Sequence, residues 1–215
     1  MPRSLEDQLT REEQALLKSL TTPMKIQDFL DSIPYRAEDE NPSPLRVIRE
    51  RRAHCLDGGL FGAMALRRLG YPPLVIDLLP VPGRDDDHVL AIYREHGCLG
   101  AVAKSNHVGL RFREPVYRTY RELVMSYFEV YFNVLKEKTL RAYTVPMDLS
   151  KFDRLGWEVN DSAVDAIEKK MKTLRAFPII TPAMAAGLNL VDERSYAGHT
   201  LGTDMAGVYK IGGEA

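Results

Sequence analysis

Cys55 stands at the predicted start of a helix whose first turns are rich in small residues, among them Gly58, Gly59 and Gly62. A helix N-terminus lowers the pKa of a cysteine placed there, because its unpaired N–H groups stabilise the nucleophilic thiolate. Each glycine inside a helix destabilises it by about 1 kcal/mol relative to alanine, so a compensating close contact with a sheet is expected. Gly70 marks the expected end of the helix. The stretch therefore predicts a nucleophilic thiol at one end of a buried helix.

A thiol nucleophile needs a base, and His88 is the histidine that best fits this role. It opens a predicted strand, follows an acidic turn and precedes an apolar run. In thiol acyl transfer, an imidazole takes the thiol proton and a third polar group fixes the tautomer of that imidazole. A two-residue turn after this strand would place Ser105 opposite His88, and a longer turn would place Lys104 or Asn106 there. We expect Asn106, or alternatively Ser105, to orient His88.

Other residues that could do chemistry are expected to have structural roles. His54 adjoins Cys55 in the sequence, and neighbouring side chains on a helix point in different directions. Carboxylates and an imidazole in Asp85-Asp86-Asp87-His88 are metal-ligand types, but no second spaced cluster completes a coordination shell. Cys98 lies in a predicted strand beside a turn. We therefore expect neither a metal nor a cofactor.

The elements that must position Cys55 and His88 begin with helices and continue with a sheet. Capping residues, prolines at first helical positions and apolar periodicity predict helices over 11–20, 23–33, 44–52, 120–128 and 162–174. Apolar, β-branched runs bounded by turn residues predict a meander of strands over 73–81, 88–94 and 98–103, and extended chain over 132–146. This order predicts an α+β fold in which the cysteine-bearing helix packs on an antiparallel β-sheet.

The length of 215 residues is sufficient for one sizeable hydrophobic core. We expect a single domain over 1–215, with its core over about 44–146. A helical N-terminal lead over 1–43 precedes this core, and a C-terminal extension over 147–215 follows it.

Composition excludes several classes of partner. The 29 Lys and Arg residues balance the 30 Asp and Glu residues, so no global field attracts nucleic acid or anionic lipid. No apolar run approaches the roughly 18 residues of a membrane span, and the first residues turn acidic where a signal peptide is apolar. Two cysteines do not make a secreted disulfide framework. We expect a cytoplasmic protein that binds neither nucleic acid nor a membrane, and the sequence leaves its oligomeric state open.

The stretch His54-Cys55-Leu56-Asp57-Gly58-Gly59-Leu60, followed by Asp87-His88-Val89 at a strand start, resembles the core of the transglutaminase-like superfamily. That superfamily shares the papain-like cysteine-peptidase fold. The resemblance covers roughly residues 44–117, and it implies that Cys55 is the nucleophile and His88 the base. Family members usually carry aspartate as the third residue, where this sequence has Ser105 or Asn106. Papain-like peptidases use asparagine in that role.

The combined interpretation is a thiol-dependent hydrolase or acyltransferase that acts on an amide or peptide-like substrate. Cys55 would attack, His88 would transfer the proton and Asn106 would orient His88. The expected partner is a small-molecule or peptide substrate. The alternative is a catalytically impaired transglutaminase-like scaffold that serves in binding or assembly.

Overall fold

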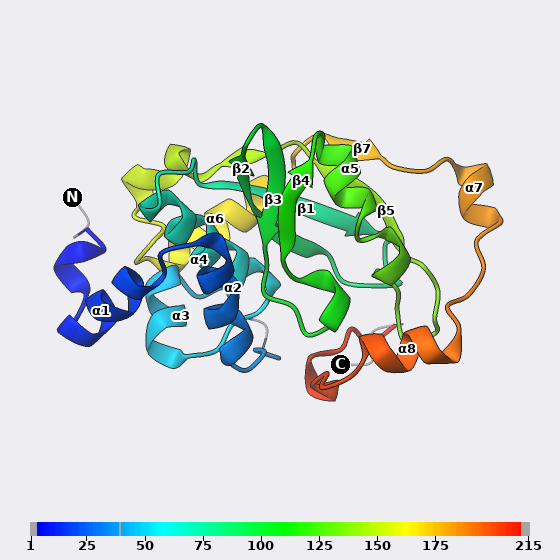
Figure 1. Ribbon diagram of the computed structural model, residues 1–215, viewed down its shortest axis with the longest axis horizontal. Helices are drawn as coiled ribbons and strands as arrows, with labels where there is room; N and C mark the ends of the chain where they lie inside the picture. Colours follow the sequence, from blue (N-terminus) through cyan, green and yellow to red (C-terminus); the bar gives the residue numbers. More distant parts are fainter. Residues whose placement is uncertain (1–3, 39, 212–215) are drawn as a thin grey trace.

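An antiparallel sheet lies at the centre of the computed structural model, which describes residues 4–38 and 40–211 (Figure 1). The strand order is β4-β3-β2-β1-β5-β7, and β6 pairs with the beginning of β1. The strands are β1 (Leu74–Pro80), β2 (His88–Glu95), β3 (Cys98–Val102), β4 (Arg113–Tyr117), β5 (Leu140–Thr144), β6 (Met147–Asp148) and β7 (Ala176–Pro178). The ends of the predicted lead and extension, residues 1–3 and 212–215, lie outside the described residues.

The hairpin from β2 to β3 has the predicted register. Glu95 pairs with Cys98, so the turn has two residues, His96 and Gly97. Both turn residues have positive φ angles, 47° and 80°, which suit the tight turns that join twisted strands. However, β3 ends at Val102, opposite Ala91. The chain therefore leaves the sheet before it reaches the position opposite His88.

Helices cover both faces of the sheet (Figure 1). They are α1 (Arg11–Ser19), α2 (Pro23–Ser32), α3 (Pro44–Glu50), α4 (Cys55–Arg68), α5 (Tyr120–Met125), α6 (Asp161–Met171), α7 (Pro182–Ala186) and α8 (Glu193–His199). Short 3-10 helices occupy η1 (Glu6–Gln8), η2 (Val108–Leu110), η3 (Phe128–Val130), η4 (Leu149–Leu155) and η5 (Met205–Gly207). Within the described residues, no helix has the length and apolar character needed to cross a membrane.

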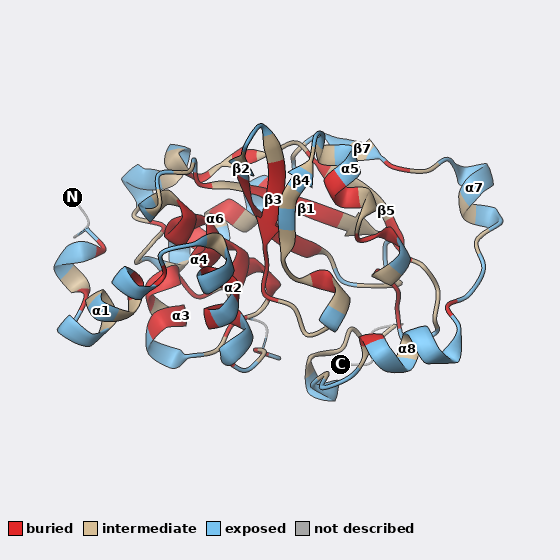
Figure 2. Cartoon of the chain, viewed as in Figure 1, coloured by how far each residue is buried: buried red, intermediate tan, exposed pale blue. Residues whose placement is uncertain are grey.

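The cysteine-bearing helix α4 packs directly on the sheet, and its residues 55–66 are all buried (Figure 2). A Cβ atom added to Gly59 would lie 2.7 Å from the side chain of Val89, and one added to Gly62 would lie 3.1 Å from Ala91. At Gly58 the added atom would be only 2.2 Å from the Cβ of Lys104. The predicted close packing of these glycines is confirmed, and so is the α+β arrangement.

The opposite face of the sheet forms a second apolar layer with α5. Leu90 and Ile92, which alternate along β2 with Val89 and Ala91, pack there with the buried Tyr127. The C-terminal segment runs past α7 and α8 along the outside of this layer and is largely exposed (Figure 2). Thr203 and Asp204 of this segment form hydrogen bonds with Asn106 in the loop that follows β3. Residues distant in sequence therefore meet close to the start of β2.

Candidate active site

The Cys55 thiol is enclosed at the N-terminus of α4, with 2% of the residue exposed. Its Sγ atom lies 3.3 Å from Nδ1 of His54 and 3.7 Å from the carbonyl oxygen of Asp87. Burial raises the pKa of the thiol because the thiolate loses hydration, while the His54 charge lowers it. Formation of the Cys55 thiolate therefore depends on the charge of the adjacent His54 imidazole.

His54 is the N-cap residue of α4 and has an extended backbone, with φ −89° and ψ −179°. Its side chain therefore leaves the helix surface and reaches the thiol, and the expectation that the two neighbours point apart was wrong. The other ring nitrogen, Nε2, lies 3.5 Å from a carboxylate oxygen of Asp86. The negative charge of a Cys55 thiolate raises the pKa of His54, burial opposes this rise, and Asp86 adds to it. Cys55, His54 and Asp86 form a thiol, imidazole and carboxylate series.

His88, the base expected from the sequence, is buried and bonded to the backbone. Its Nε2 atom lies 2.7 Å from the carbonyl oxygen of Leu110. A carbonyl only accepts, so Nε2 carries the hydrogen and Nδ1 is the unprotonated nitrogen of the neutral ring. Burial lowers the pKa of His88 to about 4. Between the described side chains of His88 and Cys55 there is no hydrogen bond.

Asn106 and Ser105 line the same cavity of about 50 Å³ as His88, but their hydrogen bonds go elsewhere. The Asn106 amide donates to the carbonyl of Asp204 at 2.8 Å and accepts from its N–H at 2.9 Å. Ser105 Oγ accepts from the N–H of His107. The expected contact of Asn106 or Ser105 with His88 is therefore not made. The reason is that β3 ends at Val102 and the C-terminal segment binds the Asn106 side chain.

Tyr35 is a site residue that the sequence did not indicate. Its ring lies 5.2 Å from the His54 ring, and its hydroxyl faces the backbone N–H of Cys55. Burial and the nearby Cys55 charge raise the pKa of Tyr35 well above its ordinary value of 10.0, so the hydroxyl keeps its proton. Tyr35 pairs with Ala53 in an isolated parallel bridge, which fixes the loop that carries it. No local pattern in the sequence predicts such a bridge.

A buried network of charged side chains holds the loop that carries Tyr35. The fully buried Arg36 guanidinium lies 2.6 Å from Glu50 and 3.5 Å from Asp57, which is itself 1% exposed. Asp57 accepts a hydrogen bond from the backbone N–H of His54 at 2.6 Å. The network therefore connects the loop after Tyr35 to the first turn of α4, where the thiol lies.

Comparison with known proteins identifies no family for this chain. No family model matches the sequence, and neither does any curated protein. Among solved structures, the chain is similar to Legionella pneumophila LapG, with a TM-score of 0.36 and 15% identity over 47% of this chain and 64% of that chain. A second structure, EGTA-treated Legionella pneumophila LapG, gives a TM-score of 0.42 and 14% identity over 74% of this chain and 86% of that chain. Similarities with TM-scores this low carry no argument about chemistry. The chemistry proposed for this chain is therefore argued from the contacts of Cys55.

Proposed function

We propose that this chain is a transglutaminase-like cysteine hydrolase or acyltransferase that acts on an amide or peptide-like substrate. The observation that carries the proposal is the 3.3 Å contact between Cys55 Sγ and His54 Nδ1. Asp86 lies 3.5 Å from the second nitrogen of the same ring. A thiol, an imidazole and an orienting carboxylate in this order are the parts of nucleophilic acyl transfer.

In the proposed first step, the Cys55 proton moves to Nδ1 of His54 and leaves a thiolate paired with an imidazolium. Burial of the thiol opposes this transfer, whereas the Asp86 carboxylate favours the charged ring. The positive end of α4 also favours the thiolate, because Cys55 is the first residue of that helix. We expect the rise in the pKa of His54 to outweigh the rise in the pKa of Cys55, so that the proton lies on His54.

The thiolate then attacks the substrate carbonyl carbon and forms an Sγ–C bond, while the carbonyl oxygen becomes an oxyanion. The Tyr35 hydroxyl would donate a hydrogen bond to that oxyanion, and the Cys55 N–H, which faces Tyr35 in the structure, would become a second donor by turning from Tyr35 to the oxyanion. The imidazolium of His54 gives its proton to the leaving amine as the C–N bond breaks. Water or an acceptor amine, deprotonated by His54, then attacks the thioester and regenerates the Cys55 thiol.

His88, the base predicted from the sequence, is the alternative to His54 in this mechanism. The observation in its favour is that the Leu110 carbonyl holds Nε2–H and leaves Nδ1 as a proton acceptor. In that alternative, Leu110 takes the orienting role expected of Asn106. His54 is preferred because its ring contacts the thiol directly.

An experiment with iodoacetamide separates an enzyme from a scaffold. At pH 7 we expect Cys55 to be alkylated faster than the more exposed Cys98, as measured by peptide mass spectrometry. A screen of fluorogenic amide and peptide substrates should then give turnover with the wild type and none with Cys55→Ala. Cys98→Ala is the matched control, and it should keep the wild-type rate. Equal alkylation of the two cysteines, with no Cys55-dependent turnover, would favour the scaffold.

A further inference from the structure

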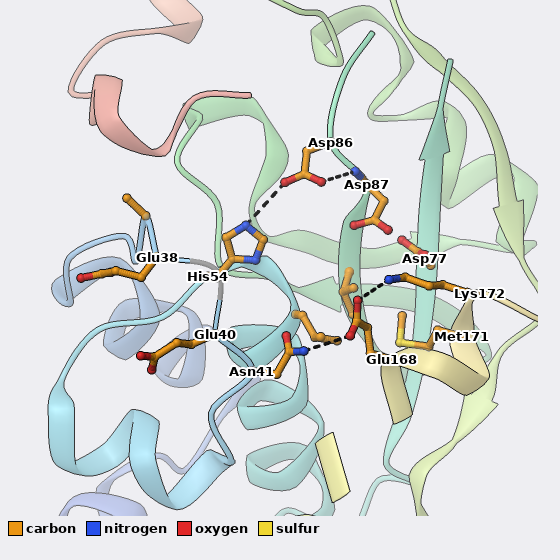
Figure 3. Close-up of a pocket in the computed structure, with 13 residues that line it drawn as sticks. Glu38, Glu40, Asn41, His54, Asp77, Asp86, Asp87, Glu168, Met171 and Lys172 are labelled. Atoms are coloured by element: carbon orange, nitrogen blue, oxygen red, sulfur yellow. Dashed lines mark hydrogen bonds and ion pairs between the residues drawn. The ribbon is translucent and has the colours of Figure 1, made fainter. Parts of the chain in front are cut away.

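A pocket of about 320 Å³ opens beside His54, between the loop after Tyr35, the start of β2 and the end of α6 (Figure 3). Within the described part of the chain, its acidic lining consists of Glu38, Glu40, Asp77, Asp86, Asp87 and Glu168. Lys172 is the lysine among the lining residues. The volume of the pocket is about ten times the roughly 30 Å³ that one water molecule occupies in the liquid, so the pocket can hold an amino-acid side chain.

The carboxylates on the loop and helix sides of the pocket are already paired with cations. Glu38 binds Arg52 at 2.5 Å, and Glu40 binds Arg46 at 2.8 Å. Glu168 binds Lys172 at 2.5 Å and also accepts from Asn41 (Figure 3). The negative charge that this lining leaves for a ligand is therefore concentrated on the opposite wall.

That opposite wall carries Asp77 and Asp87, whose carboxylates lie in the pocket facing the end of α6 (Figure 3). Asp77 is 4% exposed, and its Oδ1 atom has no hydrogen-bond partner. Its carboxylate accepts from the backbone N–H of His88. Burial and the charge of Asp87 raise the pKa of Asp77, although Lys172 opposes the rise, and a bound cation would favour the ionised form of Asp77. A buried carboxylate oxygen without a hydrogen-bond partner would be stabilised by a ligand that donates a hydrogen bond to it and carries positive charge.

We propose that this pocket binds an organic cation, the ammonium or guanidinium group of the substrate, with Asp77 and Asp87 as its partners. This inference rests on the proposed function, because His54 lines the pocket and also contacts the Cys55 thiol. A cationic side chain held here would position a nearby amide of the same molecule at Cys55. The substrate class is then a cationic peptide or an amide of a cationic amine.

An organic cation fits the pocket better than a metal ion does. Among the described residues, no group of at least three histidine, cysteine, aspartate or glutamate side chains is arranged to hold a metal. Asp77 and Asp87 lie on one wall, and the paired Glu168 lies on the other (Figure 3). An ammonium or guanidinium group brings its own hydrogen-bond donors and needs only one such wall.

Affinity alkylation tests the proposal with two reagents of equal length. One is a chloroacetamide with a butylammonium chain, and the other carries a pentyl chain. We expect the cationic reagent to alkylate Cys55 at least about tenfold faster than the neutral one, since hydrogen bonds to charged groups are the stronger ones. Cys98 of the same molecules should show no preference. Asp77→Asn and Asp87→Asn should each reduce the Cys55 ratio to about threefold or less, whereas Glu114→Gln, at an exposed position of β4, should keep it.

Because each result is a ratio of two rates in one variant, a general change in Cys55 reactivity cancels. Equal rates for the two reagents at a reactive Cys55 would overturn the cation pocket and leave the proposed function intact. Failure of both reagents at Cys55 would count against the proposed function. The pocket is then tested in Cys55→Ala protein, where butylammonium chloride should raise the Tm above that in equimolar NaCl and Asp77→Asn should remove the rise. A rise with CaCl2 and none with butylammonium would overturn the proposal.

Discussion

His54 and His88 present the same imidazole in opposite surroundings. His54 is partly exposed and lies between a thiol and the Asp86 carboxylate, so charge raises its pKa. His88 is buried at the start of β2 and bonded to a backbone carbonyl, and burial lowers its pKa to about 4. The comparison teaches that charged neighbours, more than position at a strand start, prepare an imidazole to accept a thiol proton.

The largest effect should come from exchanging the two histidines for asparagine. General-base catalysis by a positioned side chain contributes about 100-fold or more. We therefore expect His54→Asn to lower the alkylation rate of Cys55 at pH 6 by about 100-fold, as followed by mass spectrometry. His88→Asn should change that rate by less than about threefold. The reverse order would transfer the role of base to His88.

The buried imidazole should affect stability rather than rate. The pKa of His88 falls from 6.5 in the unfolded chain to about 4 in the folded one, so the unfolded chain binds more protons between these values. Stability is therefore fully present above pH 6.5 and is lost as the pH falls toward 4, by about 3 kcal/mol from this group. Urea unfolding at several pH values should show a smaller loss for His88→Gln.

A second buried histidine offers a matched control for this stability prediction. Burial also lowers the pKa of His199 to about 4, far from Cys55 in the sequence. His199→Gln should remove a further share of the acid sensitivity and leave the alkylation of Cys55 unchanged. An acid unfolding curve that neither substitution changes would contradict the assignment.

Removing the Asp86 carboxylate, which lies beside Nε2 of His54, should lower the alkylation rate of Cys55 by an intermediate amount. Asp86→Asn keeps the shape of the side chain but removes the charge that favours the imidazolium. We expect the alkylation rate of Cys55 at pH 6 to fall by about tenfold, which corresponds to one pKa unit. The pH–rate profile should shift in the same variant, because His54 then loses its proton at a lower pH. An unshifted profile would mean that Asp86 does not act through His54.

The smallest effect is expected at Asn106. Its amide bonds the backbone of Asp204 twice, so Asn106→Ala should lower the free energy of unfolding by about 1–2 kcal/mol. The alkylation rate of Cys55 should stay within about twofold of wild type, the size expected of a residue without a bond to either imidazole. A large loss of rate with unchanged stability would restore the orienting role that the sequence predicted for Asn106.

Local signals in the sequence were sufficient for much of the fold. The cap at Thr10, the paired turn residues His96 and Gly97, and the glycines of α4 fixed boundaries and register, because each acts through near neighbours in the chain. The sequence does not predict the helix α8, since the segment after residue 187 has weak periodicity and repeated glycines. Its place depends on contacts with distant parts of the chain.

The site was less predictable than the fold. The start of α4 at Cys55 follows from the local sequence, but the contact of His54 with the thiol does not, because His54 is an extended N-cap residue rather than a helical neighbour of Cys55. Asp204 lies 98 positions after Asn106, so no local pattern could reveal that it binds the Asn106 amide. Tyr35 reaches Cys55 through a bridge between separate segments. Contacts of this kind follow from tertiary packing alone.

The pH dependence of Cys55 alkylation tests most directly whether Cys55 shares its proton with His54, as we propose. A thiolate–imidazolium pair should keep the iodoacetamide rate nearly constant from about pH 8 down to about pH 5. In His54→Asn the rate should instead fall about tenfold for each pH unit below the thiol pKa. Superimposable wild-type and His54→Asn profiles, both with the slope of an isolated thiol, would contradict the account.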